Sequence, residues 1–324
     1  MSETGTRIVT IVLPETTEAQ RMAIENTVTG YGFEPRFYES PQAAEETIKD
    51  TEVLFSMSSK LAAMAENLRW QCSPSAGIDH LRNCEVFKNG QAVLTCSSGA
   101  YGVTISEHII MMILEVLRRQ SDYRTIVQAH QWTRNLPVRS IYGSRIVLLG
   151  TGDIGQAAAV RLRSFAPASL TGVSRSGSNP GLLFDKAVQV KDLNSVLPDA
   201  DILILSLPAT PETRRIIGKE QLALLPDDAL IVNVGRGVCI DQKALEEELS
   251  ARRLYAALDV FETEPIPEGD PFWDCPNLLI TPHVAGDSAL PYTVEKVVQQ
   301  FLEDFVRYAE GKPLLHQADV ARGY

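Results

Sequence analysis

Three polar segments stand out in the second half of the chain because each follows a run of apolar residues. They are "NVGRG" (233–237), "DVFETEP" (259–265) and "TPHVAG" (281–286). A buried strand has little reason to hold such residues. In open α/β sheets ligands bind beyond the carboxyl ends of the strands, so we expect the three segments to face one crevice.

The residue types in these segments suit reversible hydride transfer to a carbonyl group. An ordinary imidazole titrates near pH 6.5, at about the pH of the cell, so His283 could exchange the proton. A carboxylate beside it would orient the ring, and Glu264 is the first candidate, with Glu262 as a competitor. Arg236 could hold a substrate carboxylate and the carbonyl oxygen through its planar fork. The alternatives are a structural histidine, an exposed loop glutamate and a solvent-facing arginine.

A glycine-rich segment, "GTGDIG" (150–155), matches the pattern G-x-G-x-x-G. It follows the apolar run "RIVLL" and opens a helical stretch, which is the context of a dinucleotide site. Gly150 would make the tight turn, Gly152 would admit a pyrophosphate, and Gly155 would let helix and strand pack closely. The alternative is a strand–helix turn without a ligand. The later strands complete a doubly wound pattern, and this favours the dinucleotide site.

The choice of dinucleotide depends on the end of the next strand. An acidic residue is usual there, and it bonds the ribose hydroxyls of NAD. This chain has Arg175 instead, 175 − 155 = 20 residues after Gly155, between Ser174 and Ser176. An arginine favours the 2′-phosphate of NADP. We therefore predict NADP as the preferred cofactor, with NAD possible; the alternative is an exposed arginine in a turn.

The elements that must position these residues alternate between strands and helices. Continuous apolar runs separated by helical patterns predict an α/β fold of two doubly wound parallel-sheet domains. The first half contributes expected strands at 7–13, 52–57, 68–72 and 92–96, and a second series begins at 144–150. We expect helices at 17–30, 103–119 and 292–310 and a loop at 135–143.

Composition excludes several classes of protein. The chain has 324 residues and a formal net charge of −11, which argues against nucleic-acid and membrane partners. Its five cysteines form no C-x-x-C pair, so we expect neither a disulfide framework nor a metal site, and a reducing cytoplasm. We see no signal peptide at the N-terminus. Residues 103–117 are too few and too charged to span a bilayer.

Taken together, the motifs resemble those of the D-isomer-specific 2-hydroxyacid dehydrogenase family. "GTGDIG", "LPATPET", "NVGRG", "LDVFETEP" and "TPHVAG" stand in that family's order and approximate spacing. The resemblance implies a Rossmann cofactor domain (102–288) inserted into a flavodoxin-like substrate domain (1–101 plus 289–324). It also implies a homodimer formed through the cofactor domain.

The resemblance assigns roles residue by residue. Arg236, Glu264 and His283 match the family's catalytic residues. Ala76 and Gly77 of "SAGIDHL" match the loop whose backbone N–H groups hold the substrate carboxylate. Tyr101 is either a further substrate contact or a packing tyrosine.

The cofactor-binding positions follow in the same way. Asp259 matches the acidic residue that meets the nicotinamide carboxamide, and Leu207 and Pro208 match the loop that covers the cofactor. The full predicted set is Gly150, Gly152, Asp153, Ile154, Gly155, Ser174, Arg175, Ser176, Leu207, Pro208, Thr213, Val234, Asp259, Ala285 and Gly286.

These assignments predict an oxidoreductase acting on small 2-hydroxy or 2-keto acids. The "SRS" segment is similar to that of the NADPH-preferring glyoxylate and hydroxypyruvate reductases, so we expect reduction of such substrates to D-2-hydroxy acids. One alternative is an NAD-dependent D-lactate-type dehydrogenase. An alternative of a different class is a dinucleotide-sensing corepressor or scaffold.

Overall fold

The computed structural model describes residues 6–287 and 290–324, which form two compact units. Of the described residues, unit 1 contains 6–101 and 290–324, and unit 2 contains 102–287. The first boundary lies between Tyr101 and Gly102. The second boundary that the sequence predicts, between 288 and 289, lies outside the described residues.

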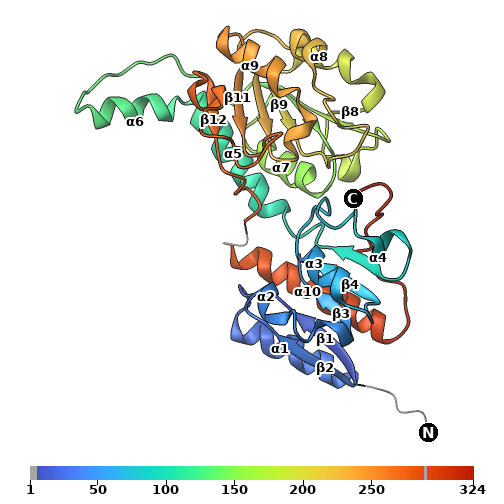
Figure 1. Ribbon diagram of the computed structural model, residues 1–324. Coiled ribbons are helices and arrows are strands. Elements are labelled where there is room, and N and C mark those ends of the chain that lie inside the picture. Colours follow the sequence, from blue (N-terminus) through green and yellow to red (C-terminus); the bar gives the residue numbers. More distant parts are fainter. Residues whose placement is uncertain (1–5, 288–289) are drawn as a thin grey trace. The chain divides into compact units, whose positions relative to one another are not determined.

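Unit 1 is built on a parallel sheet of five strands in the order β2-β1-β3-β4-β5 (Figure 1). This is the strand order of flavodoxin-like folds. The strands are β1 (Arg7–Ile11), β2 (Phe33–Phe37), β3 (Thr51–Phe55), β4 (Trp70–Ser73) and β5 (Val93–Cys96). The sequence did not predict β2, because only Phe33 of "FEPRF" is buried and the segment has no apolar run.

The helices of unit 1 include one from the far end of the chain. They are α1 (Glu18–Gly30), α2 (Pro41–Ala44), α3 (Ser59–Met64), α4 (Glu85–Lys88) and α10 (Pro291–Ala309). Thr17 caps α1 in a capping box with Gln20. The buried face of α10 carries Phe301, whose ring stacks on Phe55 of β3 with 4.2 Å between centroids. The last helix therefore completes the core of the first sheet.

Unit 2 contains a parallel sheet of seven strands in the order β12-β11-β10-β9-β6-β7-β8. The strand order reverses between β6 and β9, as in a Rossmann fold, and this is where ligands bind. The strands are β6 (Arg145–Leu149), β7 (Ser169–Ser174), β8 (Lys186–Gln189), β9 (Ile202–Leu205), β10 (Leu230–Asn233), β11 (Tyr255–Leu258) and β12 (Leu278–Ile280). The predicted fold class, two doubly wound parallel sheets, is confirmed.

The helices of unit 2 are α5 (Gly102–Leu117), α6 (Gln120–Gln128), α7 (Asp153–Arg163), α8 (Lys219–Leu224) and α9 (Gln242–Ser250). The sequence did not predict α6, which buries none of its residues and extends from the rest of unit 2 (Figure 1). Among the described residues, no helix is both long and apolar enough to cross a membrane. The five cysteines are free thiols.

Two glycines of the loop between β6 and α7 differ in their surroundings. A Cβ atom on Gly155 would lie 2.0 Å from the carbonyl oxygen of Gly150, so α7 packs directly on the turn. A Cβ atom on Gly152 would have nothing within 4 Å. Gly155 is therefore required for packing, whereas Gly152 borders open space.

This difference predicts opposite outcomes for two alanine substitutions. Gly155→Ala overpacks backbone against backbone, and we expect a loss of about 1–3 kcal/mol or more in the free energy of unfolding. Gly152→Ala, at the N-cap of α7, serves as the matched control and should cost less than about 1 kcal/mol. Urea unfolding of the two variants without cofactor measures the difference, and equal losses would contradict the packing role of Gly155.

Candidate active site at the carboxyl ends of the unit 2 strands

The three polar segments identified in the sequence lie at one edge of the unit 2 sheet. They follow β10, β11 and β12, which are neighbours in the sheet and run parallel. Their carboxyl ends therefore point the same way. The topology brings Arg236, Glu264 and His283 to that edge.

His283 and Glu264 form a close pair. The Nδ1 atom of His283 lies 2.6 Å from Oε2 of Glu264. The other carboxylate oxygen, Oε1, accepts a hydrogen bond from the backbone N–H of Phe261 at 2.8 Å. A carboxylate only accepts, so the His283 proton in this bond is on Nδ1, and Nε2 is left to exchange a proton with a ligand.

Glu262 does not compete for His283. Its Oε1 atom lies 3.3 Å from Nε of Arg215, and its backbone N–H donates to Oε1 of Gln242 at 2.9 Å. Residue types alone left Glu262 as a competitor, because both lie in the same polar segment after β11, and the family resemblance favoured Glu264. The structure gives each a different partner.

Arg236 lies between two glycines, and close packing of the neighbouring backbone requires both of them. A Cβ atom on Gly235 would lie 2.6 Å from the backbone of Leu207, and one on Gly237 would lie 1.9 Å from the carbonyl carbon of Phe261. The loops that follow β9, β10 and β11 therefore touch backbone to backbone. The Arg236 side chain is half-buried, and its Nη1 donates to the Gly235 carbonyl at 2.8 Å.

Asn233, the last residue of β10, holds this loop in place. Its side-chain oxygen accepts from the N–H of Gly235 at 3.0 Å, and its amide nitrogen donates to the carbonyl of Arg236 at 3.0 Å. The residue is 1% exposed. The sequence motifs did not predict this role, although a polar residue at the end of the apolar run "LIVN" indicates it.

The loop that carries His283 is held by one buried carboxylate, that of Asp259. Its Oδ1 accepts from the hydroxyl of Thr281 at 2.5 Å and from the N–H of Val284 at 3.0 Å, and its Oδ2 accepts from the N–H of Ala285 at 3.0 Å. Asp259 is 1% exposed. One acceptor position of Oδ2 is left over, so a nicotinamide contact stays compatible with this geometry.

His283 itself has an unusual backbone. Its φ is +54°, a left-handed conformation that non-glycine residues rarely adopt. The backbone N–H donates to the carbonyl of Asp259 at 2.9 Å. Residues held in this region commonly lie at active sites, where the surrounding hydrogen bonds enforce them.

The glycine loop of unit 2 offers a ligand backbone donors. Helix α7 begins at Asp153, and Gly152 at its N-cap provides no side-chain cap. The first N–H groups of a helix have no intrahelical acceptor, and they favour phosphate. The Asp153 side chain accepts from the backbone of Gly102, and burial raises the pKa of this carboxyl while that bond lowers it. The Asp153 carboxyl therefore contacts the start of α5.

Arg175 is exposed in the turn after β7. Ser174 accepts from the N–H of Gly177 at 3.1 Å, and Ser176 donates to Ser178 at 2.9 Å, so both hydroxyls shape the turn. The pKa of the Glu212 carboxyl is lowered by a hydrogen bond with Thr210 and, less strongly, by the positive charge of Arg175. The positive charge of Arg175 therefore acts on a carboxyl group of the loop after β9.

The other predicted cofactor positions of unit 2 lie on the same loops. Thr213 donates to the carbonyl of Pro208 at 2.6 Å and so closes the loop that begins at Leu207. Val234 is buried and bonded to Leu205 by its N–H. Ala285 is buried and Gly286 is half-buried in the loop after His283.

The residues predicted to hold the substrate carboxylate belong to unit 1. Ala76 and Gly77 are half-buried after β4, and within the described chain their backbone N–H groups donate to no acceptor. Tyr101 donates from its hydroxyl to the carbonyl of Pro74 at 2.6 Å and packs against the unit 1 core. In this structure Tyr101 therefore fixes the loop that carries the two free N–H groups.

The chain is similar in sequence and fold to known proteins. The sequence profile described as "D-isomer specific 2-hydroxyacid dehydrogenase, NAD binding domain" matches residues 110–285, all within unit 2. A glyoxylate/hydroxypyruvate reductase B from Pectobacterium carotovorum is 30% identical over 68% of this chain and 70% of its own length.

Two further relatives extend the comparison. A D-3-phosphoglycerate dehydrogenase from Methanocaldococcus jannaschii is 31% identical over 74% of this chain, but the match spans only 46% of that relative's length. The solved structure of an NADPH-dependent glyoxylate/hydroxypyruvate reductase from Sinorhizobium meliloti, in complex with NADP and sulfate, is 26% identical. It covers 99% of this chain and 100% of its own, with a TM-score of 0.80.

The matched profile spans more than half of the chain, and the reductase B relative aligns over more than two thirds of it. The Rossmann strand order and the loops after β10, β11 and β12 lie within that match. The chain belongs to the D-isomer specific 2-hydroxyacid dehydrogenase family.

Proposed function

We propose that this protein is an NADPH-preferring reductase that converts small 2-keto acids to D-2-hydroxy acids. Unit 2 (102–287) is the cofactor domain in this proposal, and unit 1 is the substrate domain. The observation that carries the proposal is the His283–Glu264 pair, which lies beside the Arg236 loop at the edge of a nucleotide-binding sheet. The reductase relatives named above support the same reaction class.

The residues of unit 2 fit a dinucleotide. Gly152 borders open space, and the uncapped start of α7 supplies backbone N–H groups for a pyrophosphate. Arg175, in the turn after β7, is the residue proposed to bind the adenosine 2′-phosphate of NADP. When bound, the nicotinamide supplies the hydride in reduction and accepts it in oxidation.

His283 is the proposed proton donor to the carbonyl oxygen during reduction. Glu264 holds the Nδ1 side of the ring, so Nε2 delivers the proton. As the ring gives up its proton, the fixed carboxylate keeps the imidazole in one orientation for the next cycle. Arg236 stabilises the negative charge that develops on the carbonyl oxygen.

The proposed carboxylate site uses the free N–H groups of Ala76 and Gly77. Two adjacent unpaired backbone donors form a small anion-binding concavity. Tyr101 contributes by holding the Pro74 carbonyl, so its role in substrate binding is to position this loop. The carboxylate of a small 2-keto acid could accept from both donors.

The two alternative functions differ in which of these residues they require. An NAD-dependent D-lactate-type dehydrogenase would not need Arg175, so the ratio of NADPH to NADH rates distinguishes it. A dinucleotide-sensing scaffold would not need the His283–Glu264 pair. A spectrophotometric screen of glyoxylate, hydroxypyruvate and pyruvate with both cofactors tests the proposal. Failure to oxidise NADPH with any of them, despite tight cofactor binding, would support the scaffold.

The first prediction of this proposal uses the two glutamates after β11 as a matched pair. Glu264→Gln removes a charge-assisted hydrogen bond to His283, worth about 1.5–3 kcal/mol, and should lower kcat about 10- to 100-fold. His283→Ala removes the proton donor and should lower kcat about 10²- to 10⁴-fold. Glu262→Gln, whose carboxylate pairs with Arg215, should retain wild-type kcat. Steady-state NADPH oxidation measures all three, and an active His283→Ala variant would remove His283 from the mechanism.

A second prediction concerns cofactor choice. Arg175→Asp exchanges a phosphate-binding charge for one that repels it, and should reduce kcat/KM for NADPH about 10- to 100-fold. The value for NADH should stay equal or rise. Lys191→Asp makes the same change of charge at another exposed position of unit 2 and serves as the control. A loss of the same size with both cofactors would argue against a 2′-phosphate site at Arg175.

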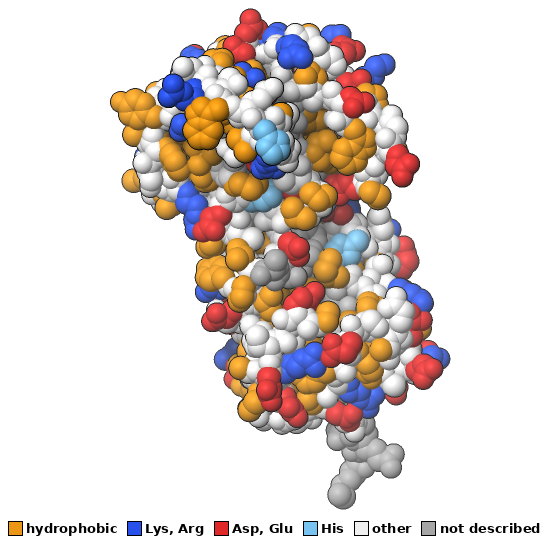
Figure 2. Space-filling view, turned by 90° about the vertical axis from the view of Figure 1, so that its left-hand side faces the viewer, with side chains coloured by type: hydrophobic (Ala, Val, Ile, Leu, Met, Phe, Trp, Pro, Cys, Tyr) orange, Lys and Arg blue, Asp and Glu red, His pale blue; other side chains and the backbone are white. Residues whose placement is uncertain are grey.

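We further propose that the protein forms a homodimer through unit 2. Helix α6 has nine residues and buries none of them, and short helices are marginal in water without packing. Trp132, shortly after it, is 89% exposed. The side of the molecule that carries α6 shows exposed hydrophobic side chains on unit 2 (Figure 2). A second copy of the chain would cover them.

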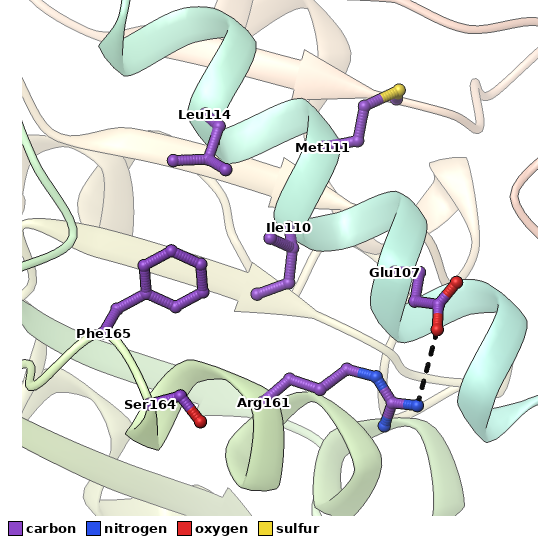
Figure 3. Close-up of a pocket in the computed structure, with 7 residues that line it drawn as sticks. All are labelled: Glu107, Ile110, Met111, Leu114, Arg161, Ser164 and Phe165. Atoms are coloured by element: carbon purple, nitrogen blue, oxygen red, sulfur yellow. Dashed lines mark ion pairs between the residues drawn. The ribbon is translucent and has the colours of Figure 1, made fainter.

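A hollow between α5 and α7 supports the same interface. It encloses about 430 Å³, and Ile110, Leu114 and Phe165 give it an apolar floor (Figure 3). Glu107 and Arg161 form an ion pair of 3.7 Å at one end. An apolar hollow with a polar rim is typical of a protein–protein contact.

The dimer proposal predicts the effect of one charge in this hollow. Met111, on its rim, is 42% exposed, so Met111→Glu should leave the fold intact and yield a monomer. Leu182→Glu introduces the same charge at an 85% exposed leucine elsewhere on unit 2, and should leave the dimer unchanged. Light scattering after gel filtration measures the masses. A monomeric wild-type protein would refute the proposal.

A further inference from the structure

A histidine outside the predicted site contacts the loop that carries His283. His108 lies in α5, and its Nε2 is 3.0 Å from the hydroxyl oxygen of Thr281 and 3.6 Å from Oδ1 of Asp259. Its side chain is 15% exposed. Neither His108 nor Thr281 belongs to the catalytic or cofactor-binding set described above.

The direction of these hydrogen bonds follows from the chemistry of the three groups. The Asp259 carboxylate only accepts, so the Thr281 hydroxyl donates to it at 2.5 Å. The same hydroxyl can then only accept from His108, so Nε2 of His108 carries a hydrogen. Burial lowers the pKa of His108, an effect that Asp259 partly opposes, so a neutral ring with its hydrogen on Nε2 fits this arrangement.

The chain His108–Thr281–Asp259 ends on the backbone around His283. Thr281 lies two residues before His283, and the N–H groups of Val284 and Ala285, directly after it, donate to the same carboxylate. Both sides of His283 are therefore tied to Asp259. Since the φ of His283 is +54°, its backbone needs such support.

We propose that His108 and Thr281 are positioning residues that hold the Asp259 carboxylate, and through it the His283 loop, in the geometry of proton transfer. The proposal rests on the proposed function and deepens the account of the same site. Neither residue touches the reacting atoms. Their removal should therefore loosen the loop and slow the chemical step more than it weakens cofactor binding.

The test uses two pairs of substitutions in the full-length protein. Thr281→Val and His108→Leu remove the hydrogen bonds, whereas Thr281→Ser keeps the hydroxyl and His108→Gln keeps an N–H donor. In the first pair, kcat for 2-keto acid reduction should fall about 3- to 10-fold, the size expected for one hydrogen bond. The dissociation constant for NADPH should change by a smaller factor than kcat, because the rest of the cofactor site is untouched. The conservative variants should recover most of kcat.

A second readout does not depend on activity. Amide hydrogen exchange of the peptide covering 281–287 reports the opening of the loop, and we expect it to be about 3- to 10-fold faster in Thr281→Val and His108→Leu. His316→Leu is the matched control, because His316 lies 3.0 Å from the buried Asp304 in unit 1 and is similarly shielded, with 21% of its side chain exposed. It should destabilise unit 1 while leaving exchange of this peptide unchanged.

The outcomes separate this proposal from the proposed function. Unchanged exchange at 281–287 in His108→Leu, or equal losses in Thr281→Ser and Thr281→Val, would overturn the positioning role even if the reductase activity stands. A wild-type protein that reduces no 2-keto acid would refute the proposed function. The exchange experiment would still decide whether His108 holds the loop.

Discussion

The geometry of the candidate active site in unit 2 depends on one buried carboxylate. Asp259 is 1% exposed, and it accepts from a hydroxyl and two backbone N–H groups of the segment Thr281–Ala285. An ionised group is buried at great cost unless it is hydrogen-bonded, so this loop and this carboxylate stabilise each other. The loop in turn fixes the left-handed backbone of His283 and the direction of its ring toward Glu264. Asp259, which the family resemblance links to the cofactor, therefore also holds the His283 loop in place.

The parallel sheet of unit 2 brings residues that are far apart in the sequence to the same edge. Arg236, Glu264 and His283 follow three adjacent strands, so their loops leave the same edge. Gly235 and Gly237 then let these loops touch backbone to backbone, which no larger residue would permit. The site is consequently precise because it is built on strand ends and close-packed turns. Free donors remain where a ligand is expected: at the start of α7 in unit 2, and at Ala76 and Gly77 in unit 1.

Apolar runs and motifs in the sequence predicted part of the fold and part of the candidate site. The order of strands, the two α/β units and the residue types of the site follow from local patterns. Strands β2 and β8 and helix α6 did not, because two edge strands and an unpacked helix have weak patterns. The family resemblance chose Glu264 over Glu262, and the structure pairs Glu264 with His283 and Glu262 with Arg215. His108 was beyond sequence reasoning for a physical reason: its bond to Thr281 joins residues 173 positions apart, and its type alone is compatible with a structural role.

The central claim is that this chain transfers a hydride from NADPH to the carbonyl carbon of a 2-keto acid, with the proton from His283. The most direct measurement uses NADPH that carries deuterium at both C4 positions, with hydroxypyruvate as the acceptor, followed by mass and chiral analysis of the product. The account predicts D-glycerate with one deuterium at C2, and a loss of this product in His283→Ala. Glycerate without deuterium, the L-isomer, or no product despite bound NADPH would contradict it.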